Sequence, residues 1–233
     1  MQAGKNAART HRSPRSIGPR GLVLTAAAAA MLSGFAATIP ASDPASADIV
    51  AQVGHSSVIA VQGPNQSLNF YWQAIGAKPW NPEQVAGPGT TLSAPAVAQV
   101  GDSSVIAAEG PGHSLDFYWQ TIGTKPWHRE QVAGAGTTFS APSIAQVGQS
   151  SVIAAEGPQH TLNYYWQAIG STPWHSELVN GINSAFAAPS VAQVGDSSVI
   201  AAEGQHNSLE FYWQTIGAKP WNCEPVTGTA STC

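Results

Sequence analysis

The sequence predicts an all-β fold built from one repeated unit, and two observations lead to this prediction. First, the tetrapeptide AQVG begins at Ala51, Ala98, Ala145 and Ala192, so each copy starts 47 residues after the one before it. Second, every copy consists of short runs rich in valine, isoleucine and aromatic residues that end at glycine or proline. Such a period indicates units that bury their apolar faces against one another.

Each copy contains four such runs, which we predict to be strands. The first is represented by APSIAQVG at 141–148, the second by SSVIAAEG at 103–110, the third by SLDFYWQTIG at 114–123 and the fourth by WHREQVAG at 127–134. The joins between them contain glycine, proline and aspartate, which suit tight turns. Four strands of about five or six residues with their turns fill one copy as a β-meander.

The third strand predicts how the copies are arranged. Alternation along it places Leu115, Phe117 and Trp119 on one face and Tyr118 and Ile122 on the other, so both faces carry large apolar groups. A sheet that is buried on both sides needs a neighbour on each side. Radial stacking of four-stranded blades, the β-propeller arrangement, provides these neighbours. A helical fold is disfavoured because glycine and proline interrupt any apolar period of 3.6 residues.

The predicted domain is therefore a β-propeller of four four-stranded blades, following the predicted signal segment. The blades are expected at about 48–94, 95–141, 142–188 and 189–233. No strand is left over to complete a split blade, so a ring of four blades would close through side-chain packing. The alternative is an open arc completed by homo-oligomerisation, because exposed blade faces would form large apolar patches.

Residues 1–47 are predicted to be a secretory signal peptide that is cleaved after Ala47. Basic residues precede an alanine-rich apolar run, which ends in the small residues Ala45-Ser46-Ala47. An uncleaved membrane anchor is the alternative, although the run is only weakly hydrophobic. The expected secreted chain has four basic and twelve acidic residues, a net charge of −8. Scattered cations in an acidic chain argue against nucleic acid or anionic lipid as partners.

The two cysteines, Cys223 and Cys233, are expected to form a disulfide in an oxidising compartment. The short loop that it closes would add about 3 kcal/mol in the chain-entropy model and would restrain the C-terminus. No metal site is expected, because two cysteines without clustered histidines do not supply four ligands for zinc.

One motif within the copy resembles a known family. The pattern Ala-x-Gly-x4-Leu-x3-Trp-Gln, followed by a later tryptophan and a proline, is present in the second copy as Ala108, Gly110, Leu115, Trp119, Gln120, Trp127 and Pro142. This pattern resembles the blade repeat of the bacterial PLL-type β-propeller lectins and, more loosely, that of the tachylectin type. The resemblance covers residues 51–233 and implies a carbohydrate-binding protein with shallow sites between blades and no catalytic activity. Those lectins usually have more blades, and a polar group near the position of Phe117 or Tyr118, so sugar specificity does not carry over.

A saccharide site needs an aromatic face that stacks on a sugar ring and fixed polar groups that bind its hydroxyls. Every copy offers a tryptophan after a proline turn, a glutamate three residues later, and a hydrogen-bonding side chain before the aromatic run. These candidate ligand-binding residues are Trp80, Trp127, Trp174 and Trp221; Glu83, Glu130, Glu177 and Glu224; and Asn69, Asp116, Asn163 and Glu210.

The alternative for these outer tryptophans is packing between blades. The mid-strand tryptophans, Trp72, Trp119, Trp166 and Trp213, are expected in the core. On this division, Trp119→Ala would destabilise the fold and Trp127→Ala would weaken ligand binding.

The sequence does not predict a catalytic site or a cofactor. The same groups recur in all four copies, whereas an enzyme concentrates unlike groups at one place, such as two carboxylates for glycoside hydrolysis. Glycans or glycoconjugates are therefore the expected partners, and weak repeated sites would gain strength through avidity. A structural or protein-interaction propeller without sugar binding is the alternative, and a glycosidase with an unrecognised site is a weaker third hypothesis.

Overall fold

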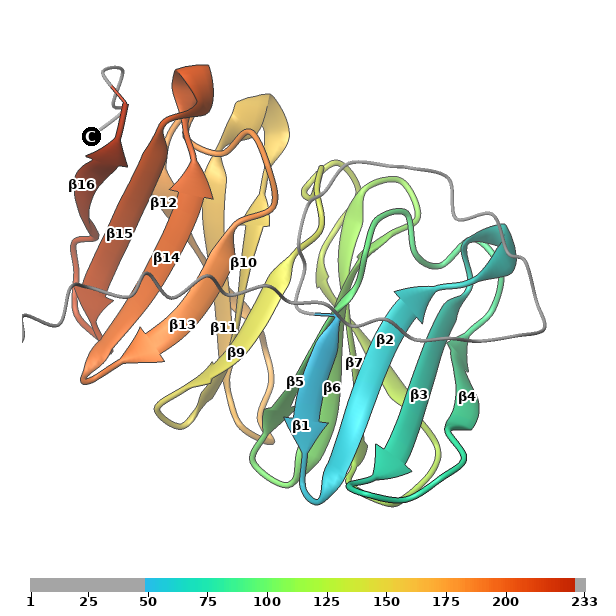
Figure 1. Cartoon of the computed structure of the whole chain (residues 1–233). Coiled ribbons are helices and arrows are strands. Elements are labelled where there is room, and N and C mark those ends of the chain that lie inside the picture. Colours follow the sequence, from blue (N-terminus) through green and yellow to red (C-terminus); the bar gives the residue numbers. More distant parts are fainter. Residues whose placement is uncertain (1–48, 229–233) are drawn as a thin grey trace, which may run out of the picture. The chain divides into compact units, whose positions relative to one another are not determined.

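The computed structural model describes residues 49–228, which lie within one compact unit, residues 43–233. Four four-stranded antiparallel sheets make up the described part of the chain, with each sheet following the order of its strands in the sequence (Figure 1). The prediction of an all-β fold with four four-stranded blades is confirmed. The predicted signal peptide and Cys233 lie outside the described residues, so cleavage and the pairing of Cys223 stay predictions. Residues 49–228 contain no helix that could span a lipid bilayer.

Each sheet is called a blade and is numbered along the chain. Blade 1 contains β1 (Val50–Val53), β2 (Ser56–Gln62), β3 (Leu68–Ala74) and β4 (Asn81–Ala86). Blade 2 contains β5 (Ala96–Val100), β6 (Ser103–Gly110), β7 (Ser114–Thr121) and β8 (His128–Ala133). Blade 3 contains β9 (Ser143–Val147), β10 (Ser150–Glu156), β11 (Leu162–Ala168) and β12 (His175–Asn180). Blade 4 contains β13 (Ser190–Val194), β14 (Ser197–Glu203), β15 (Leu209–Thr215) and β16 (Asn222–Thr227). Short 3₁₀ turns join the second and third strands of blades 1, 3 and 4: η1 (Pro64–Gln66), η2 (Pro158–His160) and η3 (Gln205–Asn207).

Consecutive blades pack face to face, as the two-sided third strand predicts. We call the face that meets the following blade the front face and the opposite one the back face. Between blades 1 and 2, the front-face residues Val53, Leu68 and Phe70 pack against the back-face residues Ile106 and Tyr118. Equivalent residues form the apolar clusters between blades 2 and 3 and between blades 3 and 4. Each large side chain buried there contributes about 2 kcal/mol, so adjacent blades stabilise one another.

The recurrent AQVG motif links the first strands of consecutive blades. The Gly101 N–H donates a hydrogen bond to Gln146 Oε1 of the next blade at 2.9 Å, and Gln146 Nε2 donates to Gly148 O at 3.0 Å. Gly101 has a φ of +53°, and a Cβ at this position would lie 3.4 Å from Ile169 Cγ2 of the next blade. Glycine is therefore favoured by the backbone conformation and by the close approach of the neighbouring isoleucine.

Buried tyrosines make stability sensitive to alkaline pH. Burial raises the pKa of the phenols of Tyr118, Tyr164 and Tyr165 above the value of about 10 that an unfolded chain has. Because the folded pKa is the higher one, these phenols favour the folded state below about pH 10, and the contribution is lost as the pH rises through the folded pKa values. We expect the Tm to fall steeply above about pH 10. Tyr165→Phe, at a position where burial alone raises the pKa, should lessen the fall, and an unchanged slope would contradict this explanation.

Candidate functional site

Three equivalent pockets lie between consecutive blades. Their volumes are about 190 Å³ between blades 1 and 2, about 210 Å³ between blades 2 and 3, and about 290 Å³ between blades 3 and 4. Each pocket is lined by the front face of one blade and by the back face of the next. The same sequence positions line all three pockets, except that Val58 and Val105 have no counterpart in the lining between blades 3 and 4, so the 47-residue repeat generates a repeated site.

The front face contributes a mid-strand tryptophan to each pocket. Trp72, Trp119 and Trp166 line the pockets between blades 1 and 2, 2 and 3, and 3 and 4. Trp119 and Trp166 are partly buried against the apolar clusters, whereas Trp72 is 38% exposed, so the expectation that these tryptophans are core residues holds only in part. Trp119 also stacks on His128 of β8, with ring centroids 4.3 Å apart, which orients the indole at the edge of the blade.

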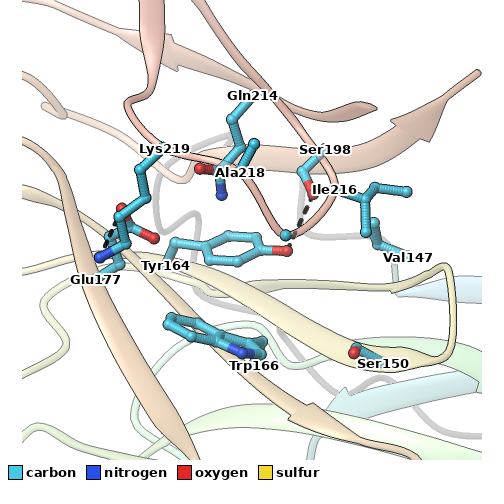
Figure 2. Close-up of a pocket in the computed structure, with 11 residues that line it drawn as sticks. Val147, Ser150, Tyr164, Trp166, Glu177, Ser198, Gln214, Ile216, Ala218 and Lys219 are labelled. Atoms are coloured by element: carbon cyan, nitrogen blue, oxygen red, sulfur yellow. Dashed lines mark hydrogen bonds and ion pairs between the residues drawn. The ribbon is translucent and has the colours of Figure 1, made fainter. Parts of the chain in front are cut away.

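The back face of the next blade contributes a glutamine. Gln120, Gln167 and Gln214 are at most 5% exposed, and the amide oxygen of each is buried without a hydrogen-bond partner among the described residues. Buried polar atoms of this kind are rarely left without a partner, so the unpaired oxygen beside each pocket is an acceptor that a ligand hydroxyl could satisfy if the amide turned toward the pocket. In the pocket between blades 3 and 4, Gln214 lies across from Tyr164 and Trp166 (Figure 2).

A single glutamate of the front face completes each pocket. Glu83 and Glu177 lie 3.6 Å and 3.3 Å from the ammonium groups of Lys125 and Lys219, which belong to the next blade. Figure 2 shows the second of these pairs beside Tyr164 and Trp166. Thr172 takes the place of lysine between blades 2 and 3. There Glu130 instead accepts hydrogen bonds from Trp174 Nε1 at 3.1 Å and from Gln167 Nε2 at 3.4 Å.

The outer tryptophans that the sequence suggested for sugar stacking pack across the blade interfaces. Trp127 lies edge to face on Phe70 of the preceding blade with ring centroids 5.1 Å apart, and Trp174 and Trp221 repeat this contact on Phe117 and Tyr164. Their positions favour packing. Trp80 has no preceding blade among the described residues and is 37% exposed.

The polar residues that precede the aromatic run do not line the three pockets. They lie against the glycine at the end of the second strand: a Cβ on Gly63, Gly110, Gly157 or Gly204 would come within 2.5 Å of Asn69, Asp116, Asn163 or Glu210. Asp116 and Glu210 are fully buried. The glycine and the polar side chain fill one space together, so this part of the repeat serves packing within the blade. Of the candidates, Glu83, Glu130 and Glu177 line pockets, and Glu224 occupies the same position on the open front face of blade 4.

The glutamines and mid-strand tryptophans are the site residues that the sequence analysis missed. The signal was the Trp-Gln dipeptide, which recurs in all four copies. Adjacent strand residues point to opposite faces, so each blade gives its tryptophan to the pocket in front and its glutamine to the pocket behind. Among residues 49–228, no group of three His, Cys, Asp or Glu side chains could hold a metal ion.

The fold resembles those of solved structures that include a lectin. The BP39L lectin from Burkholderia pseudomallei matches with a TM-score of 0.65 and 18% sequence identity over 72% of this chain and 50% of that chain. AofleA from Arthrobotrys oligospora matches with a TM-score of 0.57 and 14% identity over 76% of this chain and 55% of that chain. At these identities the likeness shows the fold, and the chain spans about half the length of the structures it matches. No protein-family model and no curated protein match the sequence.

Proposed function

We propose that the protein is a carbohydrate-binding β-propeller that holds sugars in the pockets between its blades. The observation that carries this proposal is the threefold recurrence of a partly exposed tryptophan opposite a glutamine whose buried amide oxygen has no partner among the described residues. An indole stacks on the apolar face of a sugar ring, while the carboxylate and the amide bind hydroxyls.

Several features support binding without hydrolysis. Each of the three pockets contains a single carboxylate, whereas glycosidases usually place two on either side of the scissile bond. In two pockets that carboxylate is paired with a lysine. The pair offers a hydrogen-bond acceptor and a donor to the hydroxyls of a sugar. The lectin motif of the sequence and the fold of the BP39L lectin agree with this proposal. Shallow sites of about 200–300 Å³ would each bind weakly and gain strength together on a surface dense with glycans.

Secretion is part of the same proposal. Residues 1–47 carry the features of a signal peptide, and their removal would release a chain that meets glycans outside the cell. Protein collected from the culture medium is therefore the material for the binding assay.

The binding assay is a glycan array followed by calorimetry with the best sugar. The variant Trp72→Ala/Trp119→Ala/Trp166→Ala removes the partly exposed indole from all three pockets, and we expect the number of sugars bound per chain to fall by three. Phe139→Ala/Phe186→Ala is the matched control, because these exposed aromatic residues do not line the pockets and should leave binding unchanged. Circular dichroism checks that every variant is folded.

Folded protein that shows no saturable binding to any glycan would refute the proposal and favour the protein-interaction alternative. Release of the chromogenic group from a glycoside panel would instead identify an enzyme.

A further inference from the structure

Among residues 49–228, no segment covers the front face of blade 4 or the back face of blade 1 in the way that a neighbouring blade covers the equivalent faces within the chain. On the front faces, Val53, Val100 and Val147 are at most 2% exposed, whereas Val194 of blade 4 is 61% exposed. Leu209 is 40% exposed, although its equivalents in the other three blades are fully buried. On the back face of blade 1, Val50 and Ile75 are 59% and 60% exposed.

Each open face has the residues that form one side of the interface between consecutive blades within the chain. In each internal interface an isoleucine of the following blade lies over the glycine of the AQVG turn: Ile122 over Gly54, Ile169 over Gly101 and Ile216 over Gly148. In blade 4, no described residue lies over the equivalent glycine, Gly195. The isoleucine of blade 1 that is equivalent to Ile122 is Ile75, which is exposed. The aromatic contacts follow the same rule, since Trp80 of blade 1 and Phe211 of blade 4 are the equivalents of Trp127 and Phe70.

Polar groups on the two open faces are complementary as well. Within the chain, the glycine N–H of one blade donates to a glutamine of the next, at 2.8–2.9 Å. The described residues contain no such acceptor for Gly195, while Gln52, the equivalent glutamine, lies on blade 1. Lys125 and Lys219 pair with glutamates of the preceding blade, and the exposed Lys78 and Glu224 are the corresponding residues on the two open faces.

We propose that a second copy of this chain covers these faces, with the front face of blade 4 packing on the back face of blade 1 of the partner. This contact repeats the internal blade interface and creates a further pocket that neither chain contains alone. Trp213 and Glu224 would come from one chain, and Gln73, Ile75 and Lys78 from the other. That this composite pocket binds a sugar rests on the proposed function, whereas the association itself does not.

Two copies are the number that the fold favours. Each chain has one open front face and one open back face, so the contact between chains is head to tail. Such contacts form a closed ring only when every open face is covered by a partner. Two chains of four blades give eight, which lies within the range of about four to eight blades that propellers use, and three chains would exceed it.

The first experiment measures the mass of the secreted protein by sedimentation equilibrium in the absence of sugar. We expect twice the mass of one chain for the unchanged protein and the mass of one chain for Val194→Arg, because the variant places a charge in an apolar contact. Leu178→Arg is the matched control: Leu178 is 58% exposed on the outer strand β12, away from both open faces, so the dimer should persist. A protein that is monomeric at every concentration, or a dimer that Val194→Arg leaves intact, would overturn the proposal.

A charge exchange tests the orientation of the contact. Lys78→Glu places two carboxylates together and should weaken the dimer, whereas Lys78→Glu/Glu224→Lys restores the opposite charges and should recover it. Failure of the double variant to recover would overturn the head-to-tail pairing. If the unchanged dimer binds four sugars per chain, Val194→Arg should bind three, because the composite pocket is missing. A dimer that binds no sugar would refute the proposed function and leave the association standing.

Discussion

Trp127→Ala is expected to lower the free energy of unfolding by about 3 kcal/mol, because it removes a large side chain from the interface between blades 1 and 2. The indole packs edge to face on Phe70 and lies against the apolar cluster formed by Leu68 and Tyr118. For a chain of this size the loss corresponds to a fall in Tm of roughly 6–12 °C. Urea unfolding and thermal unfolding of the purified variant measure the two quantities.

The control for this prediction is Trp80→Ala, which removes the same side chain from the same turn of blade 1. Trp80 has no aromatic partner among the described residues, so its removal should cost the single chain much less. The comparison is made in the Val194→Arg background, because the proposed dimer would cover Trp80. Equal losses of stability for the two variants would mean that the contact with Phe70 is not the source of the effect.

The fold could be predicted from the sequence because its determinants are local and repeated. Glycine and proline fix the ends of the strands, and alternation along Leu115–Trp119 shows that the third strand is buried on both faces. The apolar clusters between blades confirm this prediction, with Leu115 and Phe117 on one face and Tyr118 on the other. The cover of the end faces could not be predicted, because identical sequence is buried between blades and exposed at the ends, as Val147 and Val194 show.

The candidate site was predicted only in part, because it is formed between blades. The position of a residue within one strand predicts Trp119 in the core, and for Trp127 it leaves both sugar stacking and packing between blades open. In the structure both side chains are partly buried: Trp119 lies beside a pocket at the edge of the blade, and Trp127 packs on Phe70 of the preceding blade. Glu130 could be predicted because a glutamate follows the outer tryptophan by three residues in every copy. Its partner Gln167 belongs to the next blade, so the sequence of a single repeat does not show that the two side chains meet.

Arg129→Ser is the other substitution with a large expected effect, because it leaves a buried carboxylate without its cation. Asp116 is fully buried, and its two oxygens accept hydrogen bonds from Arg129 Nη2 at 2.9 Å and 3.0 Å. The same hydrogen bonding raises the pKa of the guanidinium. Removing one partner of a buried ion pair costs roughly 3–5 kcal/mol, and the half-exposed arginine side chain places this pair at the low end of that range. Urea unfolding of the variant measures the loss.

The repeat itself supplies the rescue. Blade 3 has Asn163 and Ser176 at the positions of Asp116 and Arg129, and it forms the same sheet with Asn163 Nδ2 donating to Thr161 Oγ1 at 3.1 Å. In Asp116→Asn/Arg129→Ser the new amide can donate to Ser114 in the same way, so no charge is left buried. We expect the double variant to recover most of the lost stability and the double-mutant cycle to show a coupling above about 1 kcal/mol. A double variant as unstable as Arg129→Ser alone would show that the arginine acts through packing on the strand, because removal of the buried charge would then bring no benefit.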